Sequence, residues 1–268
     1  MKTIAALLMT AFLASPALAQ TAVAPTKTVN IIPHRAYYTV KLKNAEGDSQ
    51  VKATDGRMII ELTHDCEGWT LKQESASVVD LKEAPSEMMR SVYTAWESDD
   101  GKSLKFKTER VFDEKMKDSV EGFAGFTDKG GTITYNSPET KEVKMAAGTL
   151  PPIAHLQKLL ETAESGQRTS SVQVFDGSFY GNPVLIDTFI GDKKGDCKLT
   201  ENKDGLYPMN LAIYAMPSVS SNPNFEIKQN IGKNGVMCSY EIKFDNYTVI
   251  GELDKYEPLP DKVCEKKQ

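Results

Sequence analysis

The sequence lacks the residue patterns of the common catalytic sites. Its 268 residues include only three histidines, and neither a Gly-x-Ser-x-Gly segment nor a glycine-rich phosphate-binding loop occurs. A nucleophilic triad needs a serine or cysteine beside a base. Asp176-Gly177-Ser178 could hold a reactive serine, but its residues are those of a β-turn. We therefore predict that the chain is not an enzyme and that it holds no catalytic residues, no cofactor and no metal.

Long apolar runs and an excess of basic charge are also missing. Lys and Arg number 32 against 37 Asp and Glu, and the two signs alternate along the chain, so we expect no binding to nucleic acid. The apolar run at residues 4–13 is shorter than the about 20 residues that span a bilayer. It follows Lys2 and precedes Pro16 and Ala17-Leu18-Ala19, the order of a cleaved signal peptide. We predict cleavage near Ala19, export to the periplasm and no membrane-spanning segment.

Cysteine is scarce, and its spacing excludes two kinds of site. The four cysteines, Cys66, Cys197, Cys238 and Cys264, form no Cys-x-x-Cys pair, so neither a zinc ribbon nor a thioredoxin-type redox site is indicated. His64 would share one face of a strand with Cys66, but two ligands are too few for a metal. An even number of cysteines in an exported chain indicates two disulfides, for which three pairings are open.

Strand patterns dominate the rest of the chain. Residues 35–42 alternate apolar and polar side chains, and turn signals recur about every 8–12 residues, as in sandwiches and barrels. Asp55-Gly56, residues 99–102 and residues 233–235 have the composition of hairpin turns. This spacing predicts about fourteen strands. We therefore predict an all-β fold in which residues 20–268 form a single domain.

One amphipathic helix interrupts the strands. Residues 151–164 begin with two prolines, which suit a first helical turn, and Gly166 lies just past their end. His155 lies off the apolar stripe, so we expect it at a solvated rim. The stripe must be buried, and we predict that the helix braces one face of the sheet. The stripe consists of Ile153, Leu156, Leu159, Leu160 and Ala163.

The length of the sheet predicts its curvature. Neighbouring strands twist by roughly 20–25°, so a long sheet curls, and its inner face is filled by its own side chains, by the helix or by a ligand. We predict a groove there for an extended peptide or an acyl chain. A fully packed core is the alternative, because most buried aromatic residues only pack. The candidate lining residues are Tyr38, Trp69 and Trp96 of the strands, beside Leu156, Leu159 and Leu160 of the helix.

Several short segments occur in an order that resembles a known family. Each segment is short, but together they cover the mature chain. They are Pro33-His34-Arg35-Ala36, Asp55-Gly56-Arg57-Met58, Cys66-Glu67-Gly68-Trp69-Thr70, Asp100-Gly101-Lys102-Ser103-Leu104, Leu150-Pro151, Phe175-Asp176-Gly177-Ser178, Gly251-Glu252-Leu253 and Glu257-Pro258-Leu259-Pro260. Their order is similar to that of the EipB-like family of alphaproteobacterial periplasmic proteins.

The resemblance implies a β-spiral, in which a long antiparallel sheet wraps into a wide-open barrel with one α-helix against it. It also implies a disulfide between Cys66 and Cys264 and a role in maintaining cell-envelope integrity. The resemblance says nothing about Cys197 and Cys238. We predict from their positions near neighbouring C-terminal strands that these two cysteines pair with each other.

The function that we expect is a non-enzymatic one. We expect a periplasmic protein that supports envelope integrity by binding a protein or lipid-like partner. A periplasmic carrier of lipoprotein or acyl chains is an alternative, by analogy with the barrels of lipoprotein carriers and anti-sigma regulators. An envelope hydrolase is a further alternative. A carrier should expose an apolar cavity, whereas a hydrolase should cluster groups with shifted pKa values in a cleft.

Overall fold

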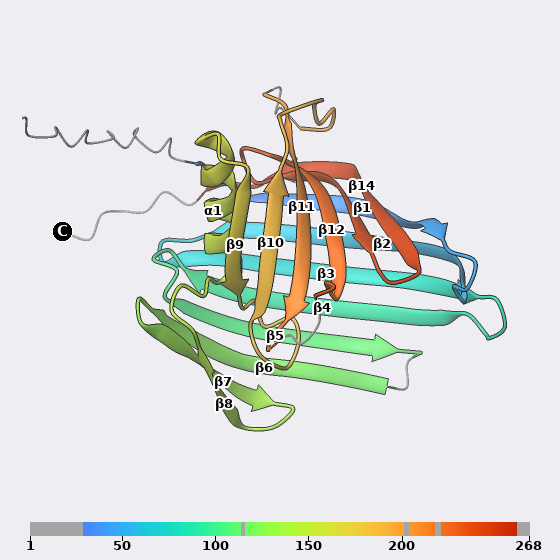
Figure 1. Ribbon diagram of the computed structural model, residues 1–268, viewed down its shortest axis with the longest axis horizontal. Helices are drawn as coiled ribbons and strands as arrows, with labels where there is room; N and C mark the ends of the chain where they lie inside the picture. The colour runs from blue at the N-terminus through green and yellow to red at the C-terminus, as the bar shows by residue number, and fades with distance from the viewer. Residues whose placement is uncertain (1–28, 114–115, 201–203, 218–220, 262–268) are drawn as a thin grey trace, which may run out of the picture.

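The fourteen strands of the computed structural model form one antiparallel sheet (Figure 1). The structure describes residues 29–113, 116–200, 204–217 and 221–261. The strand order is β8-β7-β6-β5-β4-β3-β2-β1-β14-β13-β12-β11-β10-β9, so β1 and β14 join two meanders. The elements are β1 (His34–Ala45), β2 (Val51–His64), β3 (Gly68–Leu81), β4 (Glu87–Ser98), β5 (Ser103–Phe112), β6 (Met116–Thr127), β7 (Gly130–Ser137), β8 (Lys141–Met145), α1 (Pro152–Glu164), β9 (Thr169–Val174), β10 (Val184–Ile190), β11 (Leu206–Ala215), β12 (Phe225–Gly232), β13 (Met237–Lys243) and β14 (Tyr247–Pro258).

The sheet curls without closing, which confirms the predicted fold class. Its end strands, β8 and β9, are not neighbours in the strand order of the described residues. Leu150, in the connection between β8 and α1, forms a parallel bridge to Val174 of β9 instead. In Figure 1, β9–β12 cross in front of β3–β6 at a steep angle, and α1 lies at one end of this crossing. Strand twist accumulated over fourteen strands produces such a crossing.

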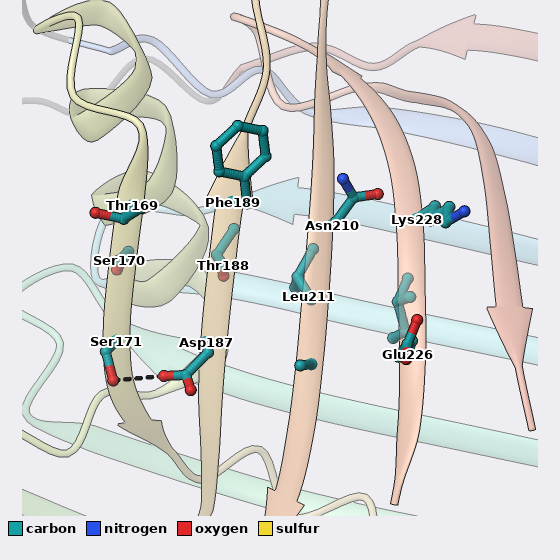
Figure 2. Close-up of a pocket in the computed structure, with 12 residues that line it drawn as sticks. Thr169, Ser170, Ser171, Asp187, Thr188, Phe189, Asn210, Leu211, Glu226 and Lys228 are labelled. Carbon is teal, nitrogen blue, oxygen red and sulfur yellow. Dashed lines mark hydrogen bonds between the residues drawn. The ribbon is translucent and has the colours of Figure 1, made fainter. Parts of the chain in front are cut away.

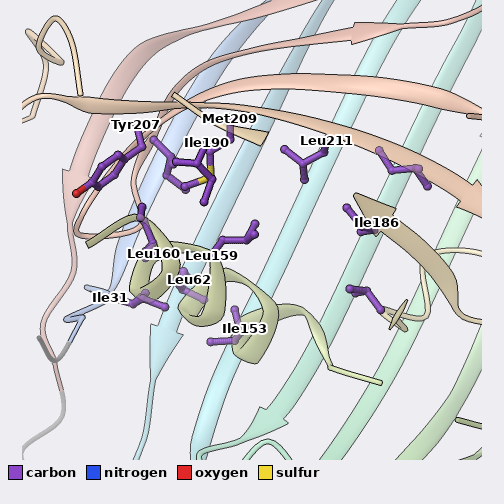
Figure 3. Packing of buried hydrophobic residues seen from close by; sticks show 14 residues of the cluster. Ile31, Leu62, Ile153, Leu159, Leu160, Ile186, Ile190, Tyr207, Met209 and Leu211 are labelled. Carbon is purple, nitrogen blue, oxygen red and sulfur yellow. The ribbon is translucent and has the colours of Figure 1, made fainter. Parts of the chain in front are cut away.

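The face enclosed between the crossing layers carries the core. On β4, Tyr93, Ala95 and Glu97 are buried and their alternate neighbours are more exposed, so we name this side the inner face and the opposite side the outer face. The largest cluster of buried side chains joins both layers to α1 (Figure 3). Leu160 of α1, for example, is fully buried in this cluster with residues of β2, β10 and β11.

Helix α1 is fixed at its N-terminus by a residue of the sheet. Its N-cap, Pro151, forms no side-chain hydrogen bond. The Glu97 carboxylate of β4 instead accepts hydrogen bonds from the backbone N–H groups of Ile153, at 2.7 Å, and Ala154, at 2.8 Å. A helix leaves such first-turn donors without partners of its own. Glu97 is 3% exposed, so this contact holds α1 inside the core. No helix of the described chain is long and apolar enough to cross a bilayer.

A second segment covers the inner face over β4–β7. Residues 175–182 form most of the connection from β9 to β10, and we name them the strap. Gly177 of the strap has a φ of +74°, and a Cβ there would meet the ring of Phe106 at 2.2 Å, so only glycine fits. Three strap carbonyls accept hydrogen bonds from the sheet: Asp176 from Tyr93 at 2.6 Å, Gly177 from Thr108 at 3.1 Å and Gly181 from Tyr135 at 2.7 Å.

The predicted hairpin turn at Asp55-Gly56 is wrong. Both residues lie inside β2, which runs without interruption between β1 and β3. A Cβ on Gly56 would lie 2.8 Å from the Cβ of Ser77 and 2.9 Å from the carbonyl oxygen of Ala76, both on β3. Gly56 therefore permits a close approach of two strands, which is the other common reason for glycine within a sheet.

The predicted pairing of Cys197 with Cys238 is confirmed. The disulfide joins the β10–β11 connection to β13, with 5.8 Å between the Cα atoms. Cys66, between β2 and β3, is not a free thiol. Its predicted partner, Cys264, lies outside the described residues, as does the expected signal segment at residues 1–19. The Cys66–Cys264 pairing therefore stays a prediction.

Candidate functional site

Four of the six predicted groove residues share one cluster. Leu159 and Leu160 of α1 are 2% and 0% exposed, and Leu156 and Trp69 are partly buried against the same core. Figure 3 shows both leucines directed toward the neighbouring strands. Leucines buried to this degree anchor the helix and cannot serve as the wall of an open groove.

Tyr38 does not belong to the cluster around α1, so its predicted place beside the helix stripe is wrong. It packs with Met58 and Tyr240 in a separate cluster and is 1% exposed. The Tyr38 hydroxyl donates to the carbonyl oxygen of Met237 at 2.7 Å, and the Tyr38 ring meets the Tyr240 ring edge-on. Its aromatic surface and its hydroxyl are thus both used in internal packing.

Trp96 lies on the outer face, and its predicted place on the inner face is also wrong. Its strand neighbours Ala95 and Glu97 are 2% and 3% exposed and point inward. Because successive side chains of a strand alternate between faces, Trp96 points outward. The sequence of β4 does not show which face is buried, because both faces carry apolar residues. Val92 and Trp96 lie on one face, and Tyr93 and Ala95 lie on the other.

Trp96 does line a groove, but on the outer face of β4–β7. This groove, which we name the outer groove, has a volume of about 550 Å³. Trp96, Lys105 and Phe123 form one row across β4, β5 and β6, and the Lys105 Nζ atom lies 5.4 Å from the centroid of the Trp96 ring. Phe123 is 51% exposed. The lining residues are Thr94, Trp96, Lys105, Phe106, Lys107, Glu121, Gly122, Phe123 and Asn136.

A second hollow lies on the outer face of β9–β12 (Figure 2). Its volume is about 510 Å³. Phe189, 55% exposed, stands at its rim, and the Ser171 hydroxyl donates to the Asp187 carboxylate at 2.6 Å. The exposure of Phe189 could not be predicted from the sequence. Its neighbour Ile190, which points to the inner face, is apolar as well. The two hollows give the outer face two exposed aromatic sites on opposite halves of the sheet.

His64 connects segments that are distant in sequence. Its Nε2 lies 2.9 Å from Asp99, its Nδ1 lies 3.0 Å from Asp261, and its ring stacks on Trp69. Burial lowers the pKa of His64, but the hydrogen bonds to Asp261 and Asp99 raise that pKa by more. The described residues contain no group of three or more side chains suited to a metal. His64 therefore tethers the C-terminal segment close to Cys66.

His155 is buried, so its predicted place at a solvated rim is wrong. It is 7% exposed, and its Nε2 atom has no hydrogen-bond partner among the described residues. Burial lowers the pKa of His155 to about 4. Thr162, which also lies off the apolar stripe, is buried too, because α1 is enclosed by both layers of the sheet. A helix enclosed in this way buries more than its apolar stripe.

Replacing His155 should change how stability depends on pH. The unfolded histidine titrates near 6.5 and the folded one near 4, so the unfolded chain binds more protons between these values. The contribution of neutral His155 is complete above pH 6.5 and is lost toward pH 4, about 3 kcal/mol in total. In His155→Met this loss is absent. The free energy of unfolding of the variant, relative to wild type, should therefore rise by about 3 kcal/mol from pH 7 to pH 4.

Urea unfolding followed by tryptophan fluorescence measures this difference. His64→Asn is the matched control, because the pKa of His64 is raised and its removal leaves the acid-side loss in place. A constant offset between His155→Met and wild type at every pH would show that His155 does not titrate as buried.

The groups that could serve a hydrolase are engaged in structural contacts. The Ser178 backbone N–H and hydroxyl both donate to the Asp176 carboxylate, at 2.8 and 2.7 Å, which is the hydrogen bonding of a turn. Burial raises the pKa of Glu97 to about 7, and its two backbone hydrogen bonds act in the opposite direction. Both Glu97 oxygens accept from α1, so this carboxylate is not placed to act as a base on a bound substrate.

Comparison with known proteins agrees with the fold. The model of the EipB-like family matches residues 25–260. A cell envelope integrity protein EipB of Brucella abortus (strain 2308) is 26% identical over 245 residues, which is 88% of this chain and 87% of that protein. The crystal structure of a β-barrel-like protein of a domain of unknown function from Brucella abortus superposes with a TM-score of 0.82 at 24% identity, over 87% of this chain and all of that chain. The chain belongs to the EipB-like family.

Proposed function

We propose that this protein acts in the periplasm and supports cell-envelope integrity by binding an envelope component, without catalysing a reaction. The observation that carries the proposal is the family match over residues 25–260, which includes nearly all described residues. The relative named for envelope integrity aligns over 88% of the chain, so the likeness is not limited to one segment. The signal-peptide pattern of residues 1–19 supports the location.

The packing of the inner face supports binding at the outer surface. Helix α1 and the strap both lie on the inner face, and both are held there by hydrogen bonds to the sheet. A carrier of acyl chains needs an open apolar cavity. Here an acyl chain would have to displace α1 or the strap. The outer groove and the hollow over β9–β12 are open in the structure as it stands, and a protein, lipid-like or other envelope ligand would reach them without a rearrangement.

Deleting the gene should weaken the envelope rather than block a metabolic step. We expect the deletion strain to grow normally in rich medium and to lose plating efficiency on detergent and on cell-wall antibiotics. Wild-type protein should restore resistance. A version without residues 2–19 is the matched control, because it should stay in the cytoplasm and should not restore resistance.

Each outcome of this experiment has a defined meaning. Normal resistance of the deletion strain to detergents and to several cell-wall antibiotics would contradict the envelope role. Full rescue by the version without residues 2–19 would contradict the periplasmic location. A growth defect that a single nutrient repairs would favour a metabolic function instead.

A further inference from the structure

The outer groove has an aromatic wall. Trp96 and Phe123 face the same side and are separated by one strand, β5, so they stand about 10 Å apart across the sheet. Phe123 leaves 51% of its surface exposed although it lies in the middle of a strand. Lys105 lies between them and extends over Trp96. Two aromatic rings at this separation can each stack on a separate flat group of one ligand.

The opposite wall of the outer groove is polar. Thr94, Lys107 and Glu121 form the next row on the outer face across β4, β5 and β6, and Asn136 of β7 also lines the groove. Together they offer a hydroxyl, an ammonium, a carboxylate and an amide, which both donate and accept hydrogen bonds. A ligand that fills the groove must therefore present an apolar face on one side and many hydroxyl or amide groups on the other.

This combination fits a sugar chain better than an acyl chain or a peptide. An acyl chain would cover the polar wall without forming hydrogen bonds, which costs free energy. An extended peptide that adds to a sheet uses a free strand edge, whereas the outer groove lies on the face of four paired strands. A pyranose ring has a flat face of C–H groups and a rim of hydroxyl groups. One disaccharide repeat of an extended β-1,4-linked chain is close in length to the separation of the two aromatic residues.

We propose that the outer groove binds a β-1,4-linked glycan chain, with Trp96 and Phe123 stacked on two rings one disaccharide repeat apart. Thr94, Glu121 and Asn136 hydrogen-bond the hydroxyl and acetamido groups along the other side. The inference rests on the proposed function, for which it names the class of envelope component that is bound.

Tryptophan fluorescence gives a direct test, because the chain has only two tryptophans. The other tryptophan, Trp69, stacks on His64. Replacing it in the Trp69→Phe variant leaves Trp96 as the single fluorescent reporter. Titration with the β-1,4-linked tetramer of N-acetylglucosamine should change the Trp96 emission and saturate. Calorimetry on wild type, which contains both tryptophans, should give the same affinity. Phe123→Ala should weaken binding about tenfold, the usual loss for one stacked ring.

Phe189→Ala is the matched control. Phe189 is 55% exposed on the outer face of the other half of the sheet, and its removal should leave the affinity unchanged. Wild type should also sediment with purified peptidoglycan sacculi, and Phe123→Ala should do so less. Absence of binding to both the tetramer and the sacculi would overturn the proposal, and so would an equal loss in Phe189→Ala. Sedimentation with phosphatidylglycerol vesicles but not with sacculi would assign the groove to lipid and would also overturn it.

Complementation separates this inference from the proposed function. If the deletion strain is sensitive and the Trp96→Ala, Phe123→Ala double variant restores full resistance, the glycan inference is wrong and the envelope role stands. If the deletion strain is resistant, the envelope role fails, whatever the protein binds. The third outcome is a double variant that is present at a normal level with an unchanged melting temperature and still fails to complement. That result supports both the glycan inference and the envelope role.

Discussion

Glu97→Ala should lower the free energy of unfolding by about 4 kcal/mol at pH 5, because it leaves two helix N–H groups without acceptors in the core. Ile153 and Ala154 donate these bonds, Ile153 is 6% exposed, and Pro151 offers no substitute cap. Urea unfolding followed by tryptophan fluorescence measures the loss. It exceeds the about 1 kcal/mol typical of an exposed N-cap, since water cannot replace the lost acceptor.

The Glu97→Gln variant keeps the shape of this cap but removes its ability to carry a charge. Burial raises the pKa of Glu97 to about 7 from an ordinary value of 4.5, so the folded state binds more protons between these values. The contribution of Glu97 to wild-type stability therefore falls as pH rises through this window, by about 3 kcal/mol. Glutamine keeps one acceptor and does not ionise. The variant should be about 1 kcal/mol less stable than wild type at pH 5 and more stable than wild type above pH 7.

The crossing of the two pH profiles is the decisive observation. A Glu97→Gln variant that is less stable than wild type by the same amount at pH 5 and pH 8 would contradict the raised pKa of Glu97. It would mean that the positive end of α1 keeps the carboxylate ionised throughout. His155→Met provides a useful comparison, because the His155 contribution has the opposite sign over almost the same pH window.

Sequence patterns predicted the class of the fold because they report local geometry. Alternating side chains, hairpin turns such as the one between β12 and β13, and the stripe of α1 depend on neighbours within a few residues. Asp55-Gly56 shows the limit of this reasoning. The same dipeptide suits a hairpin turn and a tight contact between strands, and only Ser77 and Ala76, which lie 20 or more residues away, decide between the two.

The candidate site was less predictable because alternation defines two faces without saying which one is inside. Trp96 and Tyr93 lie on opposite faces of β4, and each is aromatic. Their directions are set by α1 and the strap, which come from later parts of the chain and cover only one side. The cap formed by Glu97 could not be predicted from local sequence patterns either, because Glu97 lies 56 residues from the helix N–H group that it binds. Residue types alone thus could not show which aromatic residues point to the inner face and which to the outer face.

Removing Cys66 should cause a larger loss of stability than removing Cys197. Cys66 and its predicted partner Cys264 are 198 residues apart, so their disulfide would stabilise the fold by about 5 kcal/mol in the chain-entropy account. Cys197 and Cys238 are 41 residues apart, for which the same account gives about 4 kcal/mol. Cys66→Ser should therefore be about 1 kcal/mol less stable than Cys197→Ser in urea unfolding without reductant.

A double-mutant comparison tests the pairing itself. If Cys66 and Cys264 are bonded, Cys66→Ser, Cys264→Ser and the double variant should lose nearly the same free energy, because each removes the same bond. Additive losses, or a Cys66–Cys197 or Cys66–Cys238 peptide in non-reducing mapping, would show that the pairing is wrong. The His64–Asp261 contact provides a second, weaker link between the C-terminal segment and β2. His64→Asn should therefore destabilise the Cys66→Ser protein more than wild type, because the disulfide no longer holds that segment in place.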